Sequence, residues 1–247
     1  EGLRQSLNLI SVRVVQELVT PRAISKNAKD FGISTYIRPV DAIALGVSEV
    51  YPLEITSAYA TIANNGIYST PMAITRIEDR QGRILKEYIP ESKEVQDEAI
   101  IFILRDMMKS VVDAGTGGAL RWKYKFYAPA AGKTGTTNSK ADAWFVGFTP
   151  QLAVGIWVGM DDPSVSLGDK QFGSAAALPI FANTIRDIYE LGEFQVGDET
   201  IILSERTNWP NSRGIVEVEI CNDTYEKVTR FCPNKMKEIF LSHNRPR

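Results

Sequence analysis

Residues 131–138 read AGKTGTTN, and their side chains suit the binding of an anion. Lys133 supplies a positive charge, and the hydroxyls of Thr134 and Thr136 can donate hydrogen bonds. Gly135, between the threonines, lets a substrate or a neighbouring element approach the backbone closely. Two interpretations fit these residues. One is a loop around the phosphates of a nucleotide, and the other is a strand that holds a different anion.

The nucleotide interpretation fails on two requirements. A phosphate-binding P-loop needs a glycine five residues before its Gly-Lys-Thr, and Tyr127 stands there. Such a loop also leads into a helix, whereas a polar turn and then a strand pattern follow here. The glycine-rich DAGTGGAL (113–120) follows a predicted helix instead of a strand, so it indicates a helix end and a loop, not a dinucleotide site.

On a strand, the same residues suit a carboxylate. Alternate positions point to the same face, so Thr134 and Thr136 share one face and Lys133 points to the other side. A carboxylate could lie beside the edge of this strand, with a backbone N–H free to polarise a carbonyl.

Other chemistry is less well supported by the composition. The only histidine is His243, and two cysteines make a poor zinc site, so neither a metal nor a cofactor is predicted. Cys221 and Cys232 flank CNDTYEKVTRFC, as two unpaired thiols or as a disulfide that requires an oxidising compartment. The net charge of −2, without a basic run, predicts no nucleic-acid partner. No apolar stretch reaches the roughly 18 residues of a spanning helix.

Periodicity predicts the elements that must position these residues. An antiparallel hairpin, mostly buried on both faces, is expected from DAWFVGFTP (142–150) and LAVGIWVGM (152–160). A two-stranded ribbon is expected over 73–89. Helices are predicted over 4–20, from Pro52 to a stop at Gly66, over 98–114, and over 173–191.

The character of the chain changes after Gly192. Glycines and prolines punctuate a polar stretch, and the segments IVEVEIC and EKVTRF then predict short strands. We therefore expect two units, residues 1–192 and a small β-rich extension, residues 193–247.

Ser6-Leu7-Asn8 lies upstream in RQSLNLISVRV and supplies a Ser-x-Asn pattern that gains meaning beside GKTGTT. Together with ALGVSEVYPLEITSAYATIANNG, VVDAGTGGA and AGKTGTTNSKADAWFVGFTPQLAVGIWVGMDD, these motifs closely resemble the transpeptidase domain of class A penicillin-binding proteins. The resemblance runs from residue 2 to about 192, and CNDTY…CP…EIF resembles the C-terminal extensions of that family. It implies an α/β (α+β) fold of the β-lactamase-like type, a central antiparallel sheet flanked by helices with a small β-rich appendage.

The resemblance also implies D,D-transpeptidation of peptidoglycan stem peptides through a serine acyl-enzyme that β-lactams trap. Ser6 would relay protons, Asn8 would orient the donor peptide, and Lys133 would support the relay and attract the terminal carboxylate. Thr134, Gly135 and Thr136 would bind that carboxylate, with the N–H of Thr136 in the oxyanion hole. Since the family works outside the cytoplasmic membrane, the resemblance favours pairing of Cys221 with Cys232.

One departure from the family pattern is important. No serine in the sequence is followed by lysine three positions later, so Ser-x-x-Lys, which carries the nucleophile, is missing. In the family it precedes Ser-x-Asn, as do the glycosyltransferase domain and the membrane anchor. We expect this preceding segment as a separate chain docked beside Ser6 and Lys133, on the extracytoplasmic (periplasmic or outer) face of a bacterial membrane.

Two other functions stay open on the sequence alone. One is a related serine hydrolase, either a D,D-carboxypeptidase or a β-lactamase, whose donor pocket would look alike. The other is a non-catalytic module that retains the pocket.

Overall fold

A three-stranded antiparallel sheet lies at the centre of the protein, in a computed structural model that describes residues 1–246. Its strands are β5 (Ala131–Thr136), β6 (Asp142–Phe148) and β7 (Ala153–Gly159), in the order β5-β6-β7. In the part of the chain described, β5 therefore forms one edge of the sheet. The hairpin predicted over 142–160 is confirmed, and its first strand pairs with the strand of Lys133, but β7 is only partly buried.

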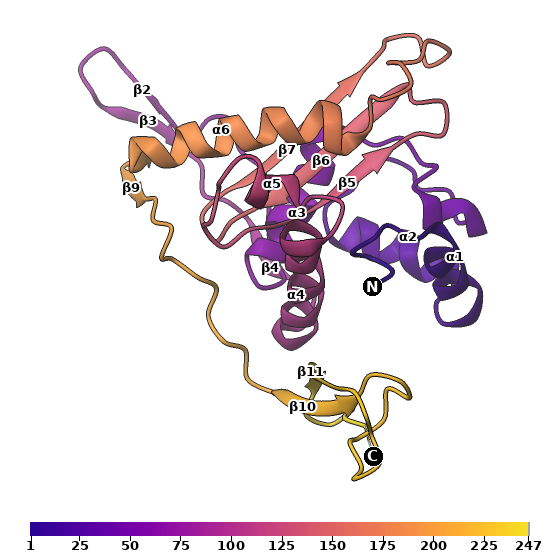
Figure 1. Ribbon diagram of the computed structural model, residues 1–247. Coiled ribbons are helices and arrows are strands. Elements are labelled where there is room, and N and C mark those ends of the chain that lie inside the picture. The colour runs from indigo at the N-terminus through magenta and orange to yellow at the C-terminus, as the bar shows by residue number, and fades with distance from the viewer. Residues whose placement is uncertain (247) are drawn as a thin grey trace.

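Helix α6 (Leu178–Leu191) covers one face of the sheet, after the single π-helical turn η2 (Gly173–Ala177) (Figure 1). The predicted helix over 173–191 thus begins with a different helical geometry. Phe181 of α6 packs on Phe145 of β6, with ring centroids 4.7 Å apart. Gly147 allows this contact, since a Cβ there would lie 2.7 Å from the Phe181 ring.

Helices α3 (Pro52–Ala63) and α4 (Glu98–Ala114) cover the other face. Proline starts α3, as predicted, and the helix ends where Asn65 (φ 53°) and Gly66 (φ 88°) adopt left-handed conformations. The side chain of Asp97 caps α4 by accepting from the amides of Ala99 and Ile100.

The apolar stripe of α4 is narrower than its sequence suggested. Ile100 and Met107 belong to the apolar face that the sequence pattern of this helix indicates, but they are 42% and 45% exposed. Arg105, in contrast, is only 2% exposed and donates to the side-chain oxygen of Asn65 across 2.6 Å. Its guanidinium also lies over the ring of Trp209, 5.1 Å from the centroid. A tertiary contact therefore buries a residue that periodicity alone assigns to solvent.

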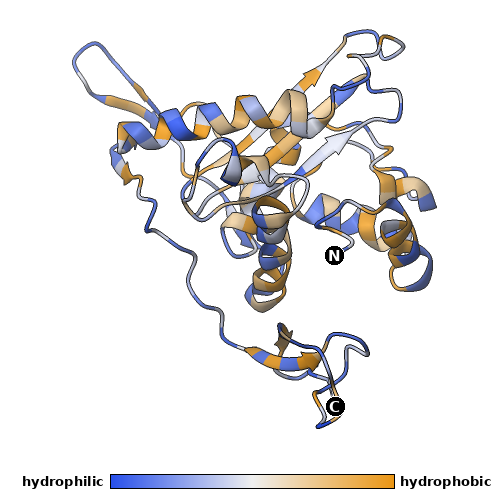
Figure 2. Ribbon diagram, viewed as in Figure 1, coloured by the Kyte–Doolittle hydropathy of each residue, from blue (hydrophilic) through white to orange (hydrophobic). Residues whose placement is uncertain are grey.

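Three helical elements lie near the open edge at β5: α1 (Asn8–Glu17), α2 (Pro21–Asp30) and η1 (Asp41–Leu45) (Figure 1). Helix α1 is shorter than the helix predicted over 4–20. Several of its apolar side chains are exposed, among them Leu9, Ile10 and Val14, and Figure 2 shows hydrophobic residues along this helix. The segment after α2 is joined to α3 by Glu54, whose carboxylate accepts from the amides and hydroxyls of Ser34 and Thr35.

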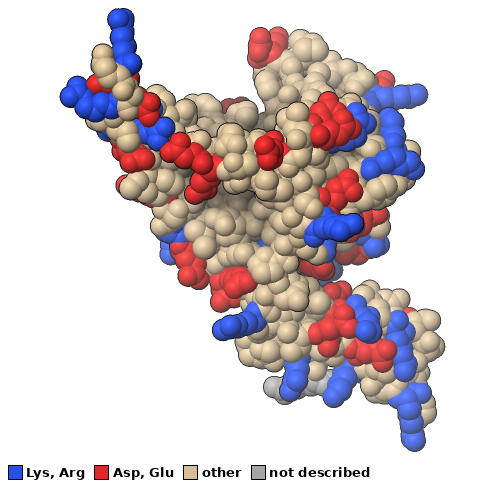
Figure 3. Space-filling view, turned by 90° about the vertical axis from the view of Figure 1, so that its left-hand side faces the viewer, with Lys and Arg blue, Asp and Glu red and all other residues tan. Residues whose placement is uncertain are grey.

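Two small strand pairs and a short helix complete residues 1–192. The predicted ribbon is confirmed as β2 (Arg76–Glu78) and β3 (Ile84–Glu87), which turn at Gly82. Strand β1 (Ile67–Ser69) pairs with β4 (Ser92–Glu94), and α5 (Ala119–Trp122) follows α4. On the face drawn in Figure 3, basic and acidic side chains are interspersed. No helix within residues 1–246 is both long and apolar enough to span a membrane.

The C-terminal region contains two hairpins. The first, β8 (Glu193–Val196) with β9 (Glu199–Ile202), follows α6 directly, and the second pairs β10 (Ile215–Cys221) with β11 (Lys235–Leu241). The strand predicted at EKVTRF (226–231) is wrong, because only Lys227 forms a bridge there, with Ile220. The partner of IVEVEIC is KMKEIFL (235–241).

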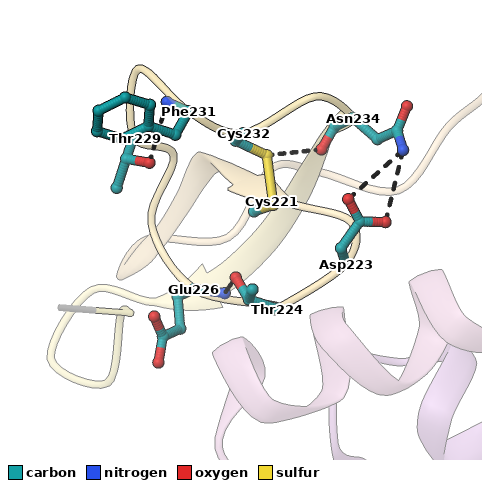
Figure 4. Close-up of a disulfide and its surroundings, with 8 residues drawn as sticks. All are labelled: Cys221, Asp223, Thr224, Glu226, Thr229, Phe231, Cys232 and Asn234. Atoms are coloured by element: carbon teal, nitrogen blue, oxygen red, sulfur yellow. Dashed lines mark hydrogen bonds between the residues drawn. A yellow bond between two sulfur atoms is a disulfide. The ribbon is translucent and has the colours of Figure 1, made fainter.

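A disulfide joins Cys221 and Cys232, and Figure 4 shows it beside the loop that connects β10 to β11. The two Cα atoms are 5.8 Å apart, inside the range that a bridge requires. In the sequence, Trp209 falls in the segment that connects the two hairpins. Its ring packs on Phe148 of the central sheet, with ring centroids 5.7 Å apart. The division into residues 1–192 and 193–247 therefore stays a proposal, and Trp209 ties the extension to the larger unit.

Candidate active site

Ser6 and Lys133 are 127 positions apart in the sequence, yet they are in direct contact. The Lys133 Nζ donates a hydrogen bond to the Ser6 Oγ across 2.8 Å. The same ammonium donates to the carbonyl of Thr134 across 2.8 Å and lies 3.5 Å from the Thr134 Oγ1. Lys133 thus starts on one face of β5 and reaches around its edge, so that its charge lies beside the hydroxyl of Thr134.

The backbone of Ser6 is held in an uncommon conformation. Its φ of 55° lies in the left-handed region, where a side chain with a Cβ is disfavoured. The tight turn before α1 imposes this geometry, since the amide of Ser6 donates to Leu3 and that of Leu7 donates to Gly2. Such local strain is found often at functional sites, and here it belongs to the residue whose hydroxyl meets Lys133.

Burial changes the acidity of Lys133. Loss of water around the ammonium lowers its pKa below the ordinary value for lysine. No carboxylate forms an ion pair with it within residues 1–246, so its hydrogen-bond partners are neutral oxygens. The cluster consequently carries an uncompensated positive charge, and the lowered pKa makes proton transfer to and from this lysine easier.

The two threonine hydroxyls have different partners. The Thr134 Oγ1 lies 2.8 Å from the Thr116 Oγ1. The Thr136 Oγ1 accepts a hydrogen bond from the amide of Gly173, at the start of η2, across 3.0 Å. Gly173 permits this approach, because a side chain there would overlap the Gly135 backbone. The close neighbour expected beside Gly135 is therefore η2.

The outer edge of β5 has no strand partner in the part of the chain that the structure describes. The amide of Thr137 donates to the carbonyl of Asp142, which marks the inward-facing pairs of the β5–β6 ladder. Because inward and outward groups alternate in an antiparallel pair, the N–H groups of Thr134 and Thr136 point away from β6. An extended peptide could lie along this edge, as the strand pattern predicted.

Asn8 is placed less closely than the other candidates. It is the first residue of α1, two positions after Ser6, and its side chain is exposed. Within residues 1–246 it makes no hydrogen bond to Lys133 or to the threonines of β5. The structure brings Ser6, Lys133, Thr134 and Thr136 to one edge of the sheet, and Asn8 lies next to that cluster along the chain.

Sequence patterns missed Thr116 as a neighbour of the site. DAGTGGAL was interpreted only as the end of a helix and a loop, and the contact with β5 spans 18 positions. Two cavities, of about 370 and 80 Å³, lie elsewhere, the first between β2, β3 and the β8–β9 turn, the second between α4 and the segment around Trp209.

Comparison with known proteins gives a consistent result. Residues 3–186 match the family model described as the penicillin binding protein transpeptidase domain. Penicillin-binding protein 1A of Aquifex aeolicus is 35% identical over 82% of this chain, and penicillin-binding protein 2D of Bacillus subtilis is 34% identical over 76%. The chain spans 28% and 27% of the length of these two relatives.

Solved structures share the architecture. The crystal structure of penicillin-binding protein 1A from Haemophilus influenzae has a TM-score of 0.85 and 25% identity, covering 100% of this chain and 40% of that one. The PonA1 protein of Mycobacterium tuberculosis, determined in complex with penicillin V, has a TM-score of 0.68 and 22% identity. The match covers 85% of this chain and 61% of the PonA1 chain, and at this sequence identity it is evidence for the fold alone.

Proposed function

The chain belongs to the penicillin-binding protein transpeptidase family, and on that premise we propose that it contributes the proton-relay and carboxylate-binding side of a serine D,D-transpeptidase. The contact between the Lys133 Nζ and the Ser6 Oγ is the observation that carries this proposal. In a site of this kind, a hydroxyl beside a lysine of lowered pKa can pass a proton between the nucleophile and the leaving group.

The reaction assigns a role to each candidate residue. A serine of a Ser-x-x-Lys segment, which is not in this chain, attacks the carbonyl of the penultimate D-alanine, and the terminal D-alanine leaves with a proton. Ser6 and Lys133 relay that proton from the serine hydroxyl to the leaving amine. An amine of a second stem peptide then attacks the acyl-enzyme, the new amide bond forms as the ester bond breaks, and the amine gives a proton back to the serine oxygen. Thr134 and Thr136 hold the carboxylate, the N–H of Thr136 stabilises the oxyanion, and Asn8 orients the donor peptide. A β-lactam stops the sequence at the acyl-enzyme.

The open edge of β5 and its uncompensated charge support these roles. The substrate carboxylate is an anion that the Lys133 ammonium attracts, and a peptide can add to the outward N–H groups as an extra strand. We extend the proposal to the segment outside this chain, which would pack beside Ser6 and the exposed apolar residues of α1, and to a glycosyltransferase domain and a membrane anchor further upstream. The disulfide agrees with an extracytoplasmic location.

Identifying the molecule that accepts the acyl group tests this function. A protein extended to include the Ser-x-x-Lys segment is incubated with a D-Ala-D-Ala stem peptide and an amine acceptor, and the products are separated by mass. Formation of the cross-linked peptide supports a transpeptidase. Release of only the shortened acid, at every acceptor concentration, would instead indicate a hydrolase, and no release of D-alanine would indicate a module without catalysis.

A further inference from the structure

Thr116 lies at the candidate site although it is outside the motifs that point to catalysis. It follows Gly115, where α4 ends, and its amide donates to the carbonyl of Arg4 across 3.2 Å. On its other side, the amide of Gly117 donates to Val111 across 3.0 Å. The end of α4 packs closely on the turn that contains Arg4, because a side chain at Gly115 would overlap the Arg4 carbonyl. The backbone of Thr116 is therefore fixed against the same turn that holds Ser6.

The hydroxyl of Thr116 has a defined partner. Its Oγ1 lies 2.8 Å from the Thr134 Oγ1, and both side chains are partly buried. We propose that Thr116 is a positioning residue, which donates its proton to Thr134 and so leaves the Thr134 proton directed at the carboxylate of the substrate. This inference rests on the proposed function and adds to it a residue that acts through another.

Accounting for protons supports this direction. A threonine hydroxyl has one proton and two lone pairs. The Lys133 ammonium can only donate, and it lies 3.5 Å from the Thr134 Oγ1, so that oxygen accepts more readily than it donates on that side. If Thr116 donates to the other lone pair, the single proton of Thr134 is free for the carboxylate. Chains of hydrogen bonds also polarise one another, which strengthens the last bond in the series.

The proposal predicts that position 116 needs a hydroxyl, and not only a side chain of this size. Valine has nearly the shape of threonine, but it offers no proton, so Thr134 would lose its donor while the packing stayed similar. Serine keeps the donor. A neutral hydrogen bond contributes about 0.5–1.5 kcal/mol, which corresponds to a rate change of about 2–12-fold.

The experiment uses the extended protein with its Ser-x-x-Lys segment, and two forms of one penicillin: the free carboxylate and its methyl ester. For Thr116→Val we expect acylation by the carboxylate to slow about 3–10-fold and acylation by the ester to stay within about twofold of wild type. Thr116→Ser should restore the rate with the carboxylate. Combining Thr116→Val with Thr134→Val should cost no more than Thr134→Val alone, because the two residues act in series.

A matched control removes a hydroxyl far from the site. Thr61 in α3 is buried and donates to the carbonyl of Ser57, so Thr61→Val should change neither rate. An equal loss with both penicillins, or additive losses in the double variant, would overturn the role of Thr116 alone. Loss of folding, seen as a lowered Tm of Thr116→Val without rescue by serine, would assign it a purely structural role. A wild-type protein that neither penicillin acylates would overturn the proposed function as well.

Discussion

The Lys133 Nζ lies 2.8 Å from the Ser6 Oγ, and this contact joins the start of the chain to the edge of its central sheet. Ser6 has a left-handed backbone, and Lys133 bends around the strand that carries it to reach the Thr134 carbonyl. A residue in a disfavoured backbone conformation whose hydroxyl meets a partly buried lysine is typical of a functional site.

Removal of the Lys133 charge should reduce acylation strongly. In the extended protein, Lys133→Ala is expected to slow acylation by penicillin at least about 100-fold, the scale for loss of one preorganised electrostatic donor. Stopped-flow measurement with a fluorescent penicillin gives the rate. Lys237→Ala is a suitable control, because Lys237 is exposed on β11 and pairs with Glu217 away from the site. A rate for Lys133→Ala within about tenfold of wild type would refute the assigned role.

Ser6→Gly should separate stability from activity. Glycine adopts the left-handed region without the penalty that serine carries there, although it loses more conformational entropy on folding. We therefore expect a Tm equal to or slightly above that of wild type. Acylation should be slower than in wild type, because the relay hydroxyl is missing. Calorimetry and acylation kinetics on the same preparation test both. A clearly lower Tm would show that the serine side chain is needed for the turn itself.

The hydrogen bonds that Glu54 accepts from Ser34 and Thr35, called the Glu54 clamp below, should make the free energy of unfolding depend on pH. Burial raises the pKa of this carboxyl, but the hydrogen bonds from Ser34 and Thr35 outweigh it, and the net pKa lies below the ordinary value. A carboxyl with a lower pKa in the folded state stabilises the fold above its unfolded pKa. That contribution is lost as the pH falls through the folded pKa.

Urea unfolding of wild type and Glu54→Gln across this acidic range measures the effect. The difference in unfolding free energy between the two proteins should be largest near neutral pH and should shrink as the pH falls. Glu87→Gln, on the exposed strand β3, is a control without such a clamp. A difference that does not vary with pH would contradict the role of the Glu54 charge.

Trp209 should be a main anchor of the C-terminal extension. Its ring is 9% exposed, packs on Phe148, and its Nε1 donates to the carbonyl of Ala63 across 3.1 Å. Trp209→Ala should lower the free energy of unfolding by about 3–5 kcal/mol, as for other large buried aromatic residues. Trp122, 68% exposed, provides the matched control and should cost little when changed to alanine. Similar losses in both variants would contradict the anchor.

Local patterns predicted the central elements well. Proline and glycine marked the limits of α3, and the aromatic and β-branched run of 142–160 identified the hairpin. The sequence around Lys133 does not meet the requirements of a P-loop, and a strand was therefore predicted there; the structure places it at the edge of the sheet. These features depend on neighbours within a few residues, which is the range over which periodicity and turn chemistry act.

Features set by distant contacts could not be predicted in this way. EKVTRF and KMKEIFL are both plausible strands, and only the pairing of β10 selects the second. Arg105 is buried because Asn65 and Trp209 meet it, 40 or more positions away. Thr116 approaches Thr134 only when the end of α4 meets β5. Each depends on which surfaces meet in the folded chain.

The site of the covalent adduct tests the central claim most directly. Intact mass followed by peptide mapping, after exposure to a labelled penicillin, is applied to residues 1–247 alone and to the extended protein. The account predicts no adduct on the isolated chain and one adduct on the extended protein, at the serine of its Ser-x-x-Lys. An adduct mapped to any serine within residues 1–247 would contradict the assignment of Ser6 and Lys133 as relay and anion-binding groups that serve a nucleophile from outside this chain.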